Sequence, residues 1–174
     1  LTVFLKTPGM KIGFGAIGKG YAANQAMKLM KSQGIENGMV NAGGDLIAWG
    51  KDENESPWKI GIADPSKQTD YIAWLNVSDM SVVTSGNYEK FVIIDGKKYG
   101  HIIYPTTGFP VRGIQSVTVV CPDAELSDAL ATSVFVLGVK AGLALINSVK
   151  NVECLIVDND NKMWPSEKLD LNYY

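Results

Sequence analysis

SVTVVCPDAELSDALATSVFVLG, residues 116–138, passes from a short β-branched run into a longer apolar run with helical character. A valine-rich run of this length is typical of a buried strand. Gly138 interrupts the apolar pattern that follows and divides it. The segment therefore predicts a strand over 114–121 and two helices, over 127–137 and 140–148.

Short strands dominate the remainder of the chain. A helix is predicted over 20–33, with Gly34 as its C-cap. Asp95 and Gly96 separate two apolar runs and give the strongest hairpin signal. Strands are predicted at the start of the chain and over 38–41, 46–49, 59–63, 72–77, 81–85, 91–94, 98–103, 153–157 and 162–164. Because hairpins outnumber βαβ crossovers, the predicted fold class is α+β, with a largely antiparallel sheet and a few packed helices.

Composition narrows the class of protein. The chain has 174 residues, of which 46% are hydrophobic, so we expect one domain over residues 1–174. A net charge of −2 and a pI of about 5.4, with no cluster of Lys and Arg, argue against nucleic acid as a partner. No run approaches the ~18 consecutive apolar residues of a membrane span. Cys121 and Cys154 are expected to be buried thiols, although neighbouring strands would also allow one disulfide.

Asp128 and Thr132 are four residues apart on a predicted helix, so their side chains share one face. Carboxylate and hydroxyl oxygens are hard ligands that suit Mg²⁺ or Ca²⁺. The same pair has a structural explanation, in which Asp128 complements the helix dipole and Thr132 bonds to a backbone carbonyl. Spacing alone favours the structural explanation.

The chain has one histidine, His101, where an apolar strand meets a Pro-Thr-Thr-Gly turn at 105–108. Strand ends that lead into loops often carry the working side chains of a protein. Imidazole changes charge near neutral pH, so any proton transfer that uses a histidine here must use His101. Taken alone, a histidine at a strand end is more often structural.

A glycine-rich stretch, GFGAIGKG at 13–20, satisfies the dinucleotide pattern G-x-G-x-x-G. The acidic residue expected at the end of the next strand is replaced by the turn at 41–45, and Gly20 stands where a Walker A motif needs Ser or Thr. Both motifs share small residues, exposed backbone and a helix N-terminus, which together with Lys19 favour a phosphate or another anion. A plain helix-entry loop is the alternative.

Five stretches follow one another in order: GFGAIGKGYAA, NAGGDLIAWG, VTSGNYEKF, YGHIIYPTTGFPV and SVTVVCPDAELSDALATSVFVLG. In this succession the chain resembles the FAD:protein FMN transferase (ApbE-like) family over about Gly13 to Gly138. The resemblance implies an ApbE-like α+β fold that binds FAD and Mg²⁺. It also implies transfer of FMN from FAD to a Thr or Ser of a target flavoprotein, with release of AMP.

The resemblance assigns roles to individual residues. A backbone carbonyl of Ala16 and side-chain oxygens of Asp128 and Thr132 would hold the metal and leave room for diphosphate and water. His101 would act as the base that deprotonates the acceptor hydroxyl. The residues that match stretches lining the flavin or diphosphate site are Lys19, Gly43, Gly44, Thr84, Ser85 and Thr107.

Two positions depart from the family pattern. Gly13 stands where the family has an Asp that contacts FAD, and Tyr104 stands where it has Asp or Asn before the proline. The metal and histidine positions are intact, which favours retained activity. A metal-dependent FAD pyrophosphatase that gives FMN and AMP, and a non-catalytic FAD-binding protein, are the alternatives.

Family members are usually longer, so the chain is expected to be a C-terminal fragment. From the family, the acceptor is expected to be a flavoprotein subunit of a membrane redox complex. The family also implies an extracytoplasmic location, in the periplasm or lipid-anchored at the outer face of the membrane. Apolar edges that an N-terminal half would cover favour self-association into a homo-oligomer.

Overall fold

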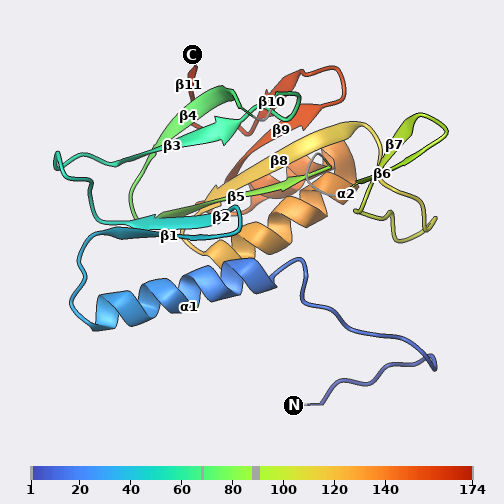
Figure 1. Ribbon diagram of the computed structural model, residues 1–174, viewed down its shortest axis with the longest axis horizontal. Coiled ribbons are helices and arrows are strands. Elements are labelled where there is room, and N and C mark those ends of the chain that lie inside the picture. The colour runs from blue at the N-terminus through green and yellow to red at the C-terminus, as the bar shows by residue number, and fades with distance from the viewer. Residues whose placement is uncertain (1, 68, 88–90, 174) are drawn as a thin grey trace.

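The computed structural model describes residues 2–67, 69–87 and 91–173, and its secondary structure forms three layers (Figure 1). Helices α1 (Gly18–Ser32) and α2 (Ala124–Ser148) cover one face of a six-stranded sheet. A three-stranded sheet covers the other face. Residues 2–17, which precede α1, run outside these layers.

Every pair of neighbouring strands is antiparallel. The large sheet has the order β1-β2-β5-β8-β9-β10, the small sheet has the order β11-β4-β3, and β6 and β7 form a separate ribbon. This arrangement confirms the predicted α+β class. The strands are β1 (Gly38–Ala42), β2 (Asp45–Trp49), β3 (Trp58–Ala63), β4 (Tyr71–Val77), β5 (Met80–Gly86), β6 (Phe91–Ile94), β7 (Lys97–Gly100), β8 (Ile114–Cys121), β9 (Glu153–Asp158), β10 (Met163–Pro165) and β11 (Asn172–Tyr173).

Strand β8 is covered on both faces, which explains its nearly continuous apolar sequence. Val117 and Val119 pack in one core cluster with Phe135 of α2. Val120 points to the opposite face and packs in a second cluster with Leu75 of β4. The segment 116–138 therefore contributes a strand and a helix to the centre of the molecule, as predicted.

Helix α2 begins after Asp123, whose side chain accepts a hydrogen bond from the backbone N–H of Leu126. The two predicted helices are joined into one element, with a kink at Gly138, where φ is +77°. By length and composition alone α2 could cross a membrane, a property that the sequence analysis did not predict. Phe135 and Ile146 are fully buried in the core cluster that includes the sheet, so packing accounts for part of the apolar composition of α2.

Two expectations about the strands were wrong, and one strand was missed. No strand forms at residues 2–5, because this segment lies away from the sheet and has no neighbouring strand to pair with. Strand β7 ends at Gly100 rather than at Ile103, which forms an isolated bridge with Pro110 instead. The short strand β11 was not predicted.

Cys121 and Cys154 are buried free thiols, as expected. Strands β8 and β9 are neighbours, but Cys154 lies opposite Val119 rather than Cys121. The two thiols are therefore offset along the strands. Burial, with a smaller contribution from the nearby charge of Glu153, raises the pKa of Cys154 to about 12.

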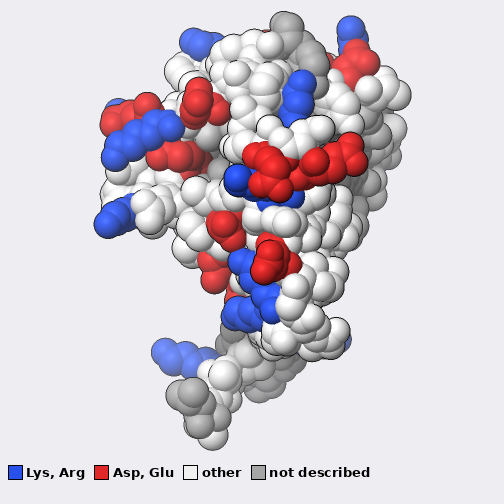
Figure 2. Space-filling view, turned by 90° about the vertical axis from the view of Figure 1, so that its left-hand side faces the viewer, with Lys and Arg blue, Asp and Glu red and all other residues white. Residues whose placement is uncertain are grey.

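Charges of both signs are mixed on the surface. On the face shown in Figure 2, Lys and Arg side chains lie beside Asp and Glu side chains. Lys31 pairs with Asp79 at 2.9 Å, and Lys51 pairs with Glu55 at 3.3 Å. Exposed pairs of this kind contribute at most about 1 kcal/mol each, so the buried layers supply most of the stability.

Candidate functional site

The first turn of α1 lies directly against the start of α2. A Cβ at Gly20 would overlap the backbone of Ala124, so only glycine allows the two helices to approach this closely. The backbone N–H of Gly20 donates a hydrogen bond to Oδ2 of Asp128 at 3.2 Å. The glycine-rich stretch thus meets the predicted metal-binding helix, although the two are more than 100 residues apart in sequence.

Asn24 fastens the same two helices one turn further along α1. Its side-chain N–H donates to Oδ1 of Asp123 at 2.9 Å, and its Oδ1 accepts from the backbone N–H of Ala124 at 3.0 Å. Burial alone would raise the pKa of Asp123, but hydrogen bonds from the Leu126 N–H and from Asn24 outweigh it and hold the pKa below its ordinary value. These contacts fix the N-terminal turn of α2, and with it Asp128.

Asp128 and Thr132 face the large sheet. Asp128 is buried, with 4% of its surface exposed, and Oγ1 of Thr132 lies 3.2 Å from Oγ of Ser85 on β5. Thr84, the neighbour of Ser85, points to the opposite face, where its hydroxyl lies 2.8 Å from that of Thr118. The structure therefore brings Ser85 together with Thr132 and turns the Thr84 side chain away from them.

The turn between β1 and β2 supplies the next part of the site. Gly43 and Gly44 both have positive φ, which suits a two-residue hairpin turn. Nζ of Lys19 lies 3.3 Å from the carbonyl oxygen of Gly43 and 2.7 Å from Oδ1 of Asp45. Three predicted residues, Lys19, Gly43 and Gly44, are thus placed together, with a charged side chain beside an exposed backbone turn.

Asp45 belongs to this site and was missed by the sequence analysis. It is fully buried, and Ile47, two residues later on the same face of β2, packs against Ala124. Burial raises the pKa of Asp45 to about 6; Lys19 opposes this rise, whereas the neighbouring Asp128 carboxyl adds to it. The sequence does contain a signal for Asp45, because this acidic residue occupies an inward position of an otherwise apolar strand.

Ala16 lies in the turn that begins α1, one helical turn before Gly20. Its carbonyl, the Asp128 carboxylate and the Thr132 hydroxyl are all hard oxygen donors, which suits Mg²⁺. Among the described residues, no group of three or more His, Cys, Asp or Glu side chains gathers to hold a metal. A cation here would therefore depend on few protein charges, and the buried carboxyl of Asp128 would supply one of them.

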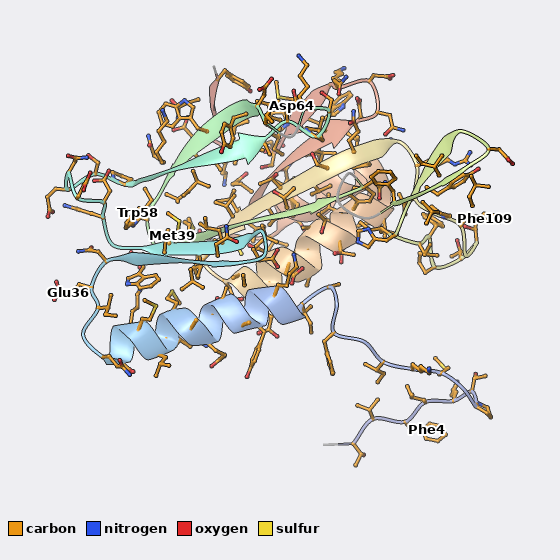
Figure 3. All side chains as sticks on the ribbon, viewed as in Figure 1. Phe4, Glu36, Met39, Trp58, Asp64 and Phe109 are labelled. Atoms are coloured by element: carbon orange, nitrogen blue, oxygen red, sulfur yellow. The ribbon has the colours of Figure 1, made fainter. Side chains whose placement is uncertain are left out.

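His101 lies immediately after β7, exposed, at the start of the loop 101–110. This loop is closed on itself, because the N–H of Tyr104 donates to the Phe109 carbonyl at 2.7 Å and the N–H of Gly108 donates to the Tyr104 carbonyl at 2.9 Å. Phe109 lies at the outer edge of the loop, on the side of the β6–β7 ribbon (Figure 3). The sequence correctly placed His101 between a strand and a loop.

Two open grooves flank this loop. One, of about 810 Å³, is lined by His101, Ile103 and Phe109 together with residues of β6 and β7. The other, of about 650 Å³, lies between Thr107 and the kink of α2 at Gly138. Part of the VTSGNYEKF stretch, residues 88–90, lies outside the described residues, so its contribution to the grooves is not described.

Comparisons with known proteins identify the relatives of this chain. The family model named ApbE family matches residues 2–156. The chain is 36% identical over 172 residues to an FAD:protein FMN transferase of Treponema pallidum, covering 93% of this chain and 48% of that protein. A second FAD:protein FMN transferase, from Klebsiella pneumoniae, is 35% identical over 158 residues. This match covers 90% of this chain and 48% of the Klebsiella protein.

Solved structures show the same likeness. The ApbE protein of Thermotoga maritima superposes with a TM-score of 0.85 at 37% identity, over 92% of this chain and 52% of that one. The flavin transferase ApbE of Vibrio cholerae superposes with a TM-score of 0.80 at 32% identity. This superposition covers 92% of this chain and 52% of the Vibrio chain. The chain spans about half the length of the curated relatives that it matches. From its sequence and its fold, the chain belongs to the ApbE family.

Proposed function

We propose that this chain supplies the metal-binding and base-bearing part of an enzyme that transfers FMN from FAD to a Thr or Ser side chain of a target flavoprotein, with release of AMP. The observation that carries the proposal is the convergence of Lys19, Asp128 and Thr132 from distant segments of the chain. The names of the relatives, FAD:protein FMN transferase, support the same reaction.

Lys19 and the turn at Gly43 and Gly44 would bind the diphosphate of FAD. The lysine provides a positive charge and the turn provides exposed backbone, which is the combination that diphosphates need. Mg²⁺, held by Ala16, Asp128 and Thr132, would neutralise charge on the diphosphate and on the departing AMP. The N–H of Gly20 keeps the Asp128 carboxylate oriented for this role.

His101 would accept the proton of the acceptor hydroxyl. The freed oxygen attacks the phosphorus of the FMN moiety, the P–O bond to the AMP phosphate breaks, and AMP leaves with that oxygen. An alcohol is a poor nucleophile near neutral pH, so a positioned base accelerates this step. The exposure of His101 beside an open groove suits a substrate that is itself a protein side chain.

The acceptor in this proposal is a flavoprotein subunit of a membrane redox complex, and the reaction takes place on the extracytoplasmic side. Support comes from the family alone. The same open site also admits water, and hydrolysis of FAD to FMN and AMP is therefore the second candidate function.

The test is an assay that combines the chain, FAD, Mg²⁺ and an acceptor flavoprotein, with covalent FMN read by in-gel fluorescence and AMP read by chromatography. His101→Ala is expected to lower covalent transfer at least 100-fold and to leave FAD binding within twofold. Lys51→Ala is the control, because Lys51 is exposed and lies beyond the end of β2 that is opposite Asp45. AMP without covalent FMN would indicate a pyrophosphatase, and FAD binding with neither product would indicate a binding protein.

A further inference from the structure

Asp45 has no role in the mechanism above, although its carboxyl is fully buried beside the predicted metal site. Oδ1 of Asp45 accepts a hydrogen bond from Lys19 at 2.7 Å. No hydrogen-bond donor among the described residues reaches its other oxygen, Oδ2. The carboxyl also lies within hydrogen-bonding and charge-interaction range of the Asp128 carboxyl.

This arrangement is costly for a protein with nothing bound. A buried carboxylate oxygen without a hydrogen-bond partner destabilises the fold, because burial removes its water and no protein donor replaces it. Two carboxylates that face one another also repel, so only a proton or a cation between them can satisfy both. Carboxylate oxygens are the protein ligands that Mg²⁺ and Mn²⁺ prefer. A buried, unpartnered carboxylate oxygen beside a second carboxylate is therefore what a cation site requires.

We propose that Asp45, through Oδ2, is an additional ligand of the cation that Asp128 and Thr132 bind, an inference that rests on the proposed function. Oδ1 stays with Lys19, so a single carboxylate connects the cation to the lysine that faces the diphosphate. The cation and Lys19 are then held on neighbouring oxygens. The site has two carboxylates, one from β2 and one from α2, in place of the single one that the family resemblance implied.

Asp45 has one competing explanation, in which it serves only as the counter-ion of Lys19. The two explanations predict different sizes of effect for Asp45→Asn relative to Lys19→Met. If Asp45 binds the cation, Lys19→Met removes a positive charge beside it and strengthens cation binding. If Asp45 only orients Lys19, it contributes no oxygen to the cation, and Asp45→Asn should change cation binding no more than Lys19→Met does, because each removes only one nearby charge.

The experiment is a titration with Mn²⁺ in the absence of nucleotide, with free Mn²⁺ measured by electron paramagnetic resonance. Asp45→Asn and Asp128→Asn are each expected to weaken Mn²⁺ binding at least tenfold, and Lys19→Met is expected to strengthen it about threefold. Asp79→Asn is the matched control, because Asp79 also pairs with a lysine at 2.9 Å but is exposed. This control should bind Mn²⁺ like the wild type. Circular dichroism verifies that each variant is folded.

The outcomes separate the inference from the proposed function. Loss of Mn²⁺ binding in Asp128→Asn but not in Asp45→Asn overturns the inference and leaves the proposed metal site intact. Weaker binding in Lys19→Met also overturns it, and this arm decides alone if Asp45→Asn does not fold. Absence of Mn²⁺ binding by the wild type, or an unaffected Asp128→Asn, contradicts the metal dependence of the proposed function as well.

Discussion

The proposed cation end of the site and the histidine end are built in different ways. At the cation end, Asp45 and Asp128 are buried, and α1, β2 and α2 hold them through hydrogen bonds between segments distant in sequence. At the histidine end, His101 is exposed on a loop that is closed mainly by its own backbone. All four residues of the neighbouring strand β6 are exposed.

The difference is the one that the proposed roles of the two ends would require. Charges that bind a diphosphate and a cation have to be held in place before the ligand arrives, and a rigid packed scaffold provides this. A base that meets the side chain of another protein needs open space around it. Packing therefore limits changes at the cation end, whereas the histidine end tolerates changes that leave His101 in place.

The largest effect is expected at the contact between the two helices. Gly20→Ala should lower the free energy of unfolding by ~2–4 kcal/mol, because the added methyl group meets the backbone of Ala124. Gly15→Ala is the control, since the space around Gly15 is open, and it should change stability by less than about 0.5 kcal/mol. Urea denaturation measures both. Equal stability of the two variants would show that the helices are not held closely together.

An intermediate effect is expected at the N-cap of α2. Asp123→Ala should lower the free energy of unfolding by about 1 kcal/mol at pH 7, because the backbone N–H of Leu126 loses its acceptor. The folded pKa of Asp123 is lowered, so its charge stabilises the fold above about pH 4, and this contribution is lost as the pH falls. The difference in the free energy of unfolding between the wild type and Asp123→Ala should become smaller below about pH 4. Asp123→Asn, which keeps the cap, should stay close to the wild type at pH 7, and a loss as large as that of Asp123→Ala would argue against capping.

The smallest effect is expected at the histidine end. Ile93→Thr on β6 should change the free energy of unfolding by less than about 0.5 kcal/mol, because Ile93 is 66% exposed. Val83→Thr provides the contrast, since Val83 is 1% exposed and the new hydroxyl would be buried, at a cost of ~1–3 kcal/mol. Thermal melts of both variants measure the difference. A large loss in Ile93→Thr would show that the ribbon is packed against something in solution.

Local patterns in the sequence predicted the centre of the fold well. The run at 114–121 and the helix that follows are correct because β8 is covered on both faces and has to be apolar throughout. Gly138 was correctly identified as an interruption, since its positive φ is not helical. The opening strand failed because a strand exists only where another strand pairs with it, and sequence does not show its partner.

The candidate site was predicted only in part. Asp128 and Thr132 share a helical face by their spacing, but Asp45 joins them through the fold, which no spacing reveals. Thr84 and Ser85 were both expected to line the site, yet neighbouring residues of a strand point to opposite faces. Because of that alternation, only one of the two side chains can face the site.

The two buried cysteines allow opening of the central sheet to be measured. A thiol-reactive dye cannot reach Cys121 or Cys154 in the closed fold, and the raised pKa of Cys154 keeps that sulfur in its unreactive protonated form. Labelling therefore occurs only when β8 and β9 separate from their neighbours. The rate of labelling at each thiol, followed as an increase in protein mass, therefore reports how often the central sheet opens. No engineered cysteine is needed.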